Sequence, residues 1–298
     1  MTQGDALGGG GAVSSLRTYR YVRLSLVAAV VFLATGLAWQ LATGGPLRSI
    51  SASYYTPVRS VFTGALFAVG VALVVLAGRS VRRFLLLLAG MTAPVIALVP
   101  VPLASEELRR LLGTACPGGA AACLPDQAVK EVTASLPAYL ITAAAVLLTS
   151  VILLALDRVL DRWALARTGI AAALLIMLAG WSTFPSFLRF GHYAAAGLFF
   201  LLIAVTAGVH AVAVREEGAF GPGTPRFYSR CYAALAVLIA AVDAALVLLL
   251  LTGRGAALLG EQWLLLGEAV ALALFGAFWV LQTLENWDRP DALLRARR

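Results

Sequence analysis

Long apolar segments alternate with short polar ones along this chain. Eight of the apolar segments run for about 17 to 25 residues, close to the roughly 20 residues that a helix needs to cross ~30 Å of hydrocarbon. Backbone polar groups find no other partners in lipid, so each segment is expected to be α-helical. We place these spans at residues 21–41, 58–77, 84–103, 132–156, 168–184, 190–214, 232–252 and 263–283.

The pattern predicts an all-α fold, a polytopic integral membrane bundle of about eight transmembrane helices that forms one domain over residues 16–288. Residues 1–15 are rich in glycine and polar, which predicts a disordered cytoplasmic tail. Residues 289–298 predict a basic cytoplasmic tail. The first apolar segment exceeds the 7–15 residues of a typical signal-peptide core, so we interpret it as a retained span.

Composition excludes a soluble domain. The chain is 61% hydrophobic and 13% charged, with a mean hydropathy of +0.89, whereas roughly a quarter of the residues in a soluble domain are charged. The net charge of +8 comes from short arginine clusters between spans, and Lys130 is the single lysine. No basic stripe is present, so we expect no nucleic-acid partner.

The distribution of positive charge predicts the orientation. With eight spans and the N-terminus inside, sixteen of the 23 basic residues fall on the inner side, as the positive-inside rule requires. We therefore predict an N-in, C-in protein that crosses the cell membrane several times, with membrane lipids as its partners. The sequence does not indicate an oligomeric state.

This orientation places Cys116 and Cys123 in an outer loop, where an oxidising environment lets them form a disulfide. Closing a ring of eight residues should stabilise the loop by roughly 2.5 kcal/mol. A metal site is poorly supported, because two cysteines without a nearby histidine do not complete a tetrahedral set. Cys231 is expected to be a lone thiol, and no cofactor is indicated.

Ionisable residues within apolar spans are costly in lipid and usually face the bundle interior or a cavity. Asp243, Glu268 and His192 are such residues, and they are the catalytic candidates. For the carboxylates the structural alternative is an interhelical hydrogen bond that stabilises the bundle, and for His192 it is a satisfied histidine at the membrane boundary.

The polar, aromatic run from Ser49 to Gly64 lies between two apolar spans and contains the ligand-binding candidates, namely Arg59, Tyr54, Tyr55 and Ser51. If four spans surround one outward-facing cavity, these residues converge with the catalytic candidates. Arg59 would then bind a phosphate or carboxylate head group, and a carboxylate and a histidine would be available for proton transfer. The alternative is a structural network in which Arg59 neutralises Glu268.

Three sequence segments together resemble a family of uncharacterised bacterial polytopic membrane proteins. They are the Ser49–Gly64 run, Gly191-His-Tyr-Ala-Ala-Ala-Gly-Leu-Phe-Phe200 and Glu268-Ala-Val-Ala-Leu-Ala-Leu-Phe-Gly-Ala-Phe-Trp279. That family is in turn similar to the eukaryotic DRAM / FGF-receptor-activating (Frag-type) family, which includes a protein of GPI-anchor lipid remodelling. The bacterial pattern has an acidic residue after the motif arginine, whereas this chain has Ser60, so a fixed Arg–Asp pair at this position is in doubt.

The resemblance implies a membrane protein with an outward-facing polar site, directed at lipid and without an established reaction. We hypothesise that the protein binds or senses a lipid or small amphiphile. The alternatives are a proton-coupled transporter that relays protons through Asp243 and Glu268, a lipid-modifying enzyme with one of these carboxylates as base and His192 as proton donor, and a purely structural partner protein. The sequence does not decide whether the protein is an enzyme.

Overall fold

A computed structural model describes residues 4–78, 80–219 and 221–287, and only the backbone of residues 4–17. Within this part of the chain each predicted span is a helix, which confirms the all-α bundle. The helices are α1 (Gly4–Thr43), α2 (Arg59–Val75), α3 (Val81–Leu98), α4 (Ser105–Leu112), α5 (Asp126–Leu156), α6 (Arg162–Ser182), α7 (Pro185–Glu217), α8 (Pro225–Thr252), α9 (Gly255–Leu259) and α10 (Trp263–Glu285).

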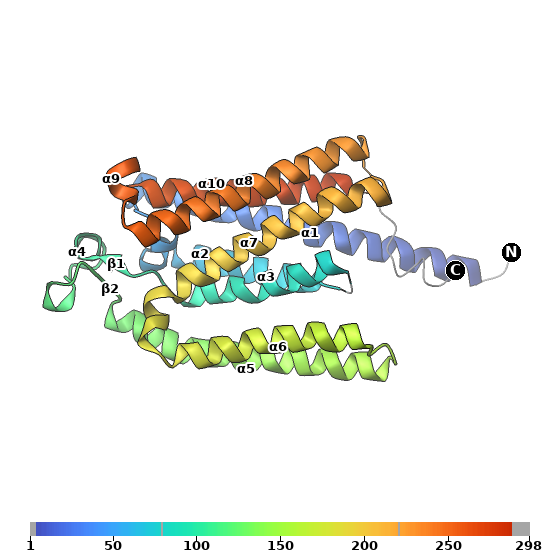
Figure 1. Ribbon diagram of the computed structural model, residues 1–298, viewed down its shortest axis with the longest axis horizontal. Coiled ribbons are helices and arrows are strands. Elements are labelled where there is room, and N and C mark those ends of the chain that lie inside the picture. Colours follow the sequence, from blue (N-terminus) through green and yellow to red (C-terminus); the bar gives the residue numbers. More distant parts are fainter. Residues whose placement is uncertain (1–3, 79, 220, 288–298) are drawn as a thin grey trace.

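The long helices run up and down between two ends of the bundle (Figure 1). Among the described residues, seven helices are long and apolar enough to cross a membrane. The apolar helix α2 is shorter, with 17 residues, and is about 26 Å long at the rise of an α-helix. One end, here called the hairpin end, carries the 3₁₀ helix η1 (Ser51–Tyr55), α4, α9 and the short strands β1 (Leu103–Ala104) and β2 (Ala122–Cys123).

At the opposite end, here called the terminal end, the N-terminal half of α1 meets the chain beyond α10. Arg20 Nε donates a hydrogen bond to the Trp287 carbonyl oxygen at 2.6 Å. Eight passes therefore return the chain to the side on which it started. Which side is cytoplasmic stays a prediction from the charge distribution.

Several helix boundaries follow from local capping. Asp161 accepts a hydrogen bond from the Ala164 amide at 2.7 Å and caps α6, and Thr224 caps α8 directly before Pro225, a residue suited to the first helical turn. Gly253 ends α8 with a φ of 64°, a left-handed conformation that favours glycine.

The central helices pack through small residues. α7 packs along α3 and α8, while α1 packs against α2 and α10. Gly70 of α2 and Gly90 of α3 face each other so closely that a Cβ atom on Gly90 would lie 2.9 Å from the Gly70 carbonyl oxygen. In a lipid environment such close backbone approach supplies much of the packing energy between helices.

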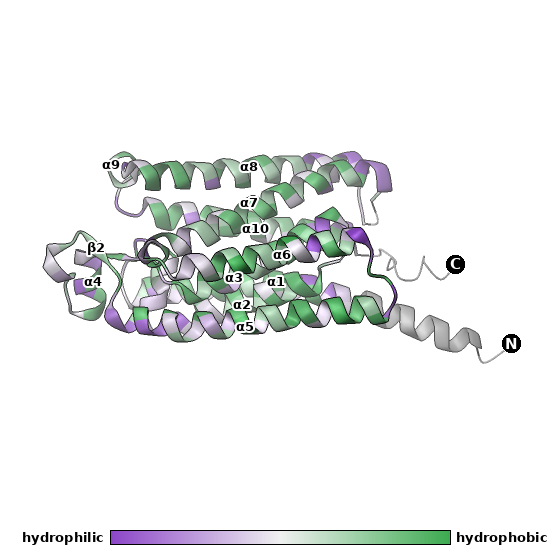
Figure 2. Cartoon of the chain, turned by 60° about the horizontal axis from the view of Figure 1, so that its bottom comes forward, coloured by the Kyte–Doolittle hydropathy of each residue, from purple (hydrophilic) through white to green (hydrophobic). Residues whose placement is uncertain are grey.

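α5 and α6 form a hairpin at the edge of the bundle, with weaker contacts to α3 and α7 (Figure 1). None of the most apolar part of α5 is buried within the protein. Figure 2 shows hydrophobic residues along the middle of the long helices and hydrophilic residues toward their ends and in the loops. This distribution is that of a multi-pass membrane protein with lipid-exposed helix faces.

The structure differs from the predicted segmentation in three places. The polar loop after the third span contains α4 and the antiparallel β1–β2 pair, in which Leu103 is opposite Cys123. Residues 185–189 belong to the first turns of α7 because Pro185 is tolerated there. α1 already begins at Gly4, where the sequence predicts a disordered tail, and no proline interrupts this helix.

The predicted disulfide is present, with the Cα atoms of Cys116 and Cys123 5.8 Å apart, and Cys231 is a free thiol. α3 continues through Pro94 and ends at Leu98. The predicted basic tail, residues 289–298, lies outside the described residues.

Candidate functional site

The candidate site is built around η1, which follows α1 and returns the chain into the hairpin end of the bundle. Ser49 Oγ accepts a hydrogen bond from the Ala52 amide at 3.0 Å, and Thr56 Oγ1 donates to the Ser53 carbonyl oxygen at 2.9 Å. These short side chains satisfy backbone groups that a 3₁₀ turn leaves unpaired. The polar run Ser49–Thr56 therefore folds as a buried turn between two membrane helices.

Glu268 of α10 holds the start of this turn. Its Oε2 atom accepts hydrogen bonds from the backbone amides of Ile50 at 2.5 Å and Ser51 at 3.3 Å. Its Oε1 atom lies 3.1 Å from Ser51 Oγ. A carboxyl group at the first amides of a helical turn satisfies donors that have no partner within the turn.

His192 of α7 reaches Ser51 from the other side. Its Nε2 atom lies 2.8 Å from Ser51 Oγ, and its Nδ1 atom lies 2.6 Å from the Val99 carbonyl oxygen at the end of α3. His192 and Ser51 are both buried, with 2% and 6% of their surface exposed. The three side chains form one row of hydrogen bonds, with the Ser51 hydroxyl between an imidazole and a carboxyl group.

Counting protons constrains the charges in this row. A carbonyl oxygen only accepts, so His192 Nδ1 carries a proton, and in a neutral ring Nε2 then accepts from Ser51. The single hydroxyl proton of Ser51 is used in that bond, so the contact with Glu268 requires a protonated carboxyl that donates. In the other tautomer Ser51 donates to an ionised Glu268 and an imidazolium donates to Ser51. Both tautomers hold the same number of protons, and the neutral one separates no charge away from water.

Beneath Ser51 and Glu268 lies an apolar cavity of about 90 Å³. Side chains of α1, α2, α3, α7 and α10 line it, and Ser51 and Glu268 are its polar lining residues. A wider hollow of about 580 Å³ opens beside the disulfide, next to Arg189 and Tyr193. The hairpin end thus contains a central apolar cavity, closed on one side by the polar pair Ser51 and Glu268. A more open hollow lies separately beside the disulfide.

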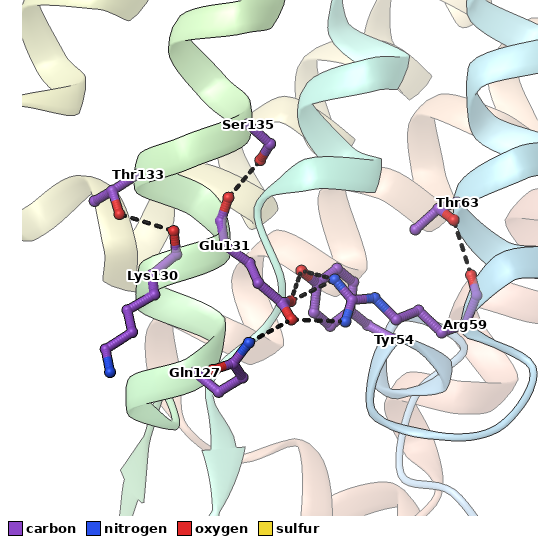
Figure 3. A network of polar contacts seen from close by, with 8 residues as sticks. All are labelled: Tyr54, Arg59, Thr63, Gln127, Lys130, Glu131, Thr133 and Ser135. Carbon is purple, nitrogen blue, oxygen red and sulfur yellow. Dashed lines mark hydrogen bonds and ion pairs between the residues drawn. The ribbon is translucent and has the colours of Figure 1, made fainter.

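Arg59 belongs to a second network at the same end (Figure 3). Its guanidinium binds both carboxylate oxygens of Glu131 on α5, one of them at 3.0 Å. It also donates to Tyr54 Oη at 2.6 Å and stacks over that ring at 4.0 Å, an arrangement that combines a two-pronged ion pair with a cation–π contact. Arg59 thereby connects η1 and α2 to the α5–α6 hairpin.

The two tyrosines of η1 serve as hydrogen-bond donors. Tyr54 Oη donates to Glu131 at 2.8 Å, and Tyr55 Oη donates to the Val101 carbonyl oxygen at 2.8 Å. Burial raises the pKa of both phenols above their usual value, and the hydrogen bond to Glu131 adds to this rise for Tyr54. Both hydroxyls therefore stay protonated at neutral pH.

The structure brings some of the candidate residues together and separates others. Ser51, His192 and Glu268 are in one hydrogen-bonded row, as the convergence hypothesis expected. Arg59 pairs with Glu131, so the alternative in which it neutralises Glu268 is wrong. The carboxylate of Asp243 lies against Gly197 of α7, where a Cβ atom would be 3.7 Å from Oδ1, and Asp243 is not among the residues that hydrogen-bond Glu268.

Two members of these networks were not identified from the sequence. Glu131 is separated from Arg59 by 72 positions and lies directly before the span predicted at residues 132–156, although its position four residues after Gln127 fits the first turns of a helix. The Val99 carbonyl that orients His192 is a backbone atom and leaves no signal in residue type. Among the described residues, no group of three or more His, Cys, Asp or Glu side chains could hold a metal ion.

Comparison with known proteins adds no relative: no family model, curated protein or solved structure matches this chain. The resemblance to the bacterial and Frag-type families therefore rests on the sequence motifs alone.

Proposed function

We propose that this multi-pass membrane protein binds one aliphatic chain of a lipid or small amphiphile in the central cavity. The observation that supports this most is the lining of the cavity, which is apolar apart from Ser51 and Glu268. Apolar cavities stay dry and take up apolar guests, as an engineered cavity of about 150 Å³ takes up benzene, and at about 90 Å³ this cavity has room for a short part of such a chain. The polar end of the ligand lies toward Ser51.

In this proposal the selectivity for the ligand comes from the polar pair Ser51 and Glu268. An alkyl chain gains little by leaving lipid for a protein cavity, because lipid tails are as apolar as the cavity wall. A hydrogen bond to Ser51 or Glu268 in the same low-dielectric site adds to the binding energy. The protons of these two groups are already used within the row, so they accept rather than donate. The preferred ligand is therefore an amphiphile with a hydroxyl group, an ester lipid with a free hydroxyl included, rather than a plain hydrocarbon.

A matched pair of substitutions on α2 tests the proposal. Ala65 lines the cavity and is 2% exposed, whereas Ala68 on the same helix is exposed. Ala65→Phe fills the cavity and should lower the lipid retained by the purified protein about tenfold in native mass spectrometry, while Ala68→Phe should retain it. Equal lipid content in the two variants would contradict binding in this cavity.

Arg59 is the proposed contact for an anionic head group. Its side chain is 42% exposed although it is paired with Glu131, and a guanidinium can bind a phosphate or carboxylate with two parallel hydrogen bonds. Tyr54, which donates to the same carboxylate, is part of this contact. In this role Glu131 competes with the ligand for the guanidinium.

We further propose that the hairpin end faces the outside of the cell membrane, as the excess of arginine at the terminal end favours. The three cysteines of the chain allow a direct test. After mild reduction of intact cells, a membrane-impermeant maleimide should label Cys116 and Cys123, and Cys231 should react only after permeabilisation. Labelling of Cys231 alone in intact cells would reverse the orientation.

A further inference from the structure

The contacts of the Ser51 hydroxyl match those of an activated nucleophile. Its oxygen lies 2.8 Å from His192 Nε2, and the far nitrogen of the same ring is held at 2.6 Å by the Val99 carbonyl. A hydroxyl within hydrogen-bond reach of a base that a third group orients is the arrangement by which enzymes activate serine. In this chain the backbone carbonyl takes the place of the orienting carboxylate.

The direction of the hydrogen bonds fits the same role. In the tautomer without charge separation, the proton of Ser51 points to His192 Nε2, and Nδ1 donates to Val99. His192 is then the acceptor that a nucleophilic attack by Ser51 requires. Glu268 Oε1 lies 3.1 Å from Ser51 Oγ, and in this tautomer the protonated carboxyl donates that hydrogen bond.

Ser51 also faces the ligand site. It lines the apolar cavity, whereas the neighbouring Ser49 hydroxyl accepts from the Ala52 amide within the turn. Ser53 Oγ is buried and makes no hydrogen bond to a described residue. Of the three serines in this turn, the one that touches the cavity is the one that contacts the imidazole.

We propose that Ser51 is the nucleophile and His192 the general base of an acyl-transfer reaction on an aliphatic carboxylic ester held in the cavity. This inference rests on the proposed binding of an aliphatic chain there. The substrate class is an acyl lipid, and the acceptor of the acyl group is water or a hydroxyl-bearing amphiphile.

The reaction balances in two halves. Ser51 Oγ bonds to the ester carbonyl carbon while its proton moves to His192 Nε2, and the carbon–alkoxy oxygen bond then breaks as His192 returns the proton to the leaving alcohol. The product is an acyl ester of Ser51. In the second half, the oxygen of water or of the acceptor hydroxyl attacks the acyl carbon, its proton moves to His192, and Ser51 Oγ leaves and regains that proton.

Glu268 is a positioning residue in this scheme. It fixes the backbone of Ile50 and Ser51 and contacts Ser51 Oγ. Glu268→Gln preserves the neutral pattern, since the amide oxygen accepts from the two backbone amides and the amide nitrogen donates to Ser51. Glu268→Ala removes both interactions.

An alkyl fluorophosphonate tests the proposal on the full-length protein in lipid–detergent micelles. Attack by Ser51 Oγ on phosphorus releases fluoride and leaves a stable adduct, which peptide mass spectrometry locates. The wild type should carry the adduct on Ser51. His192→Gln, which keeps hydrogen-bonding capacity but lacks a base, should lower the labelling rate at least ~100-fold, the usual range for loss of a general base.

Three further variants serve as controls. Ser51→Ala should carry no adduct, and Ser53→Ala should label at the wild-type rate because Ser53 is not among the residues that hydrogen-bond His192 or line the cavity. Glu268→Gln should label at least tenfold faster than Glu268→Ala.

The outcomes separate this inference from the proposed function. If the wild-type protein retains lipid in native mass spectrometry but forms no adduct on Ser51, the assignment of Ser51 as nucleophile is wrong and the proposed lipid binding stands. This measurement does not depend on the folding of any variant. If His192→Gln and the wild type are labelled at equal rates, the assignment of His192 as general base is wrong. If Ala65→Phe and Ala68→Phe retain lipid equally, the binding proposal itself is wrong.

Discussion

The two ends of the bundle contain related sets of buried polar residues that are used differently. α7 carries His192 toward the hairpin end and His210 toward the terminal end, and α10 carries Glu268 and Glu285 in the same order. At the hairpin end, a serine from the short 3₁₀ helix η1 lies between the histidine and the carboxyl group and faces a cavity.

At the terminal end, the polar groups that contact one another within the described part of the chain come from the long helices α7, α8 and α10 or directly follow α10. His210 Nε2 lies 2.9 Å from Gln282 Nε2, Asn286 Nδ2 donates to Gln282 Oε1 at 3.1 Å, and Tyr232 Oη lies 3.3 Å from Glu285 Oε2. The rings of Tyr232 and Phe278 pack on His210, with centroids 5.4 Å and 6.1 Å away. A polar network enclosed by aromatic rings in this way stabilises a helix contact.

Residue type alone therefore does not distinguish a structural network from a reactive one. The difference lies in the neighbours: a small hydroxyl at the wall of a cavity in one case, and amides packed under aromatic rings in the other.

The largest expected difference is in serine reactivity. His192→Gln should slow the reaction of Ser51 with an alkyl fluorophosphonate at least ~100-fold, whereas His210→Gln should change the rate less than about threefold, because His210 contacts Gln282 and not Ser51. Labelling rates of both variants, measured beside their unfolding temperatures, give the comparison. Similar losses in both would mean that the effect is one of stability.

The second prediction concerns the disulfide. Loss of the Cys116–Cys123 bond by paired Cys→Ser substitution should destabilise its loop by roughly 2.5 kcal/mol, because the bond closes a short ring at the edge of the fold. Hydrogen exchange should accelerate in residues 103–124 and stay unchanged in α10. Faster exchange throughout the bundle would show that the disulfide-bonded loop with β1 and β2 stabilises the whole fold.

The third prediction concerns the terminal end. Gln282→Leu removes hydrogen-bonding groups from a packed network and should lower the free energy of unfolding by about 1–2 kcal/mol. Gln262→Leu, at an exposed position before α10, is the matched control and should change it by less than about 0.5 kcal/mol. Both are measured by chemical unfolding in micelles, and equal values would argue against a stabilising network.

The smallest effect is expected at Arg59. A partly exposed ion pair contributes only about 0.2–1 kcal/mol, so Arg59→Ala and Glu131→Gln should both be mildly destabilising. Their effects on anionic lipid should have opposite signs: Arg59→Ala lowers the retained amount and Glu131→Gln raises it, because the freed guanidinium gains a ligand. If the retained anionic lipid decreases in both variants, the Arg59–Glu131 pair only holds the α5–α6 hairpin against the bundle and does not bind the ligand.

The sequence predicts the helices well because a membrane span has a simple signature. Apolar runs of sufficient length located the seven long apolar helices and the shorter α2. The placement of Cys116 and Cys123 in one outer loop predicted their bond. The convergence of Ser51, His192 and Glu268 was also expected, since polar residues in apolar spans usually face the interior.

The partners of individual side chains were harder to predict. The choice of Glu131 rather than Glu268 by Arg59 depends on where the α5–α6 hairpin docks, which no local pattern encodes. The orientation of His192 depends on a carbonyl freed where α3 ends after Pro94. Asp243 is acidic and lies in a span like Glu268, yet it faces Gly197 of α7 because of the rotation of α8 about its axis.

The most direct test of the account is photo-crosslinking with an ester lipid that carries a diazirine in its alkyl chain. Binding in the cavity predicts adducts on its lining residues, such as Phe62, Phe199 and Phe275, and their loss in Ala65→Phe but not in Ala68→Phe. Adducts confined to lipid-exposed residues such as Phe67 and Val71, unchanged in Ala65→Phe, would contradict it.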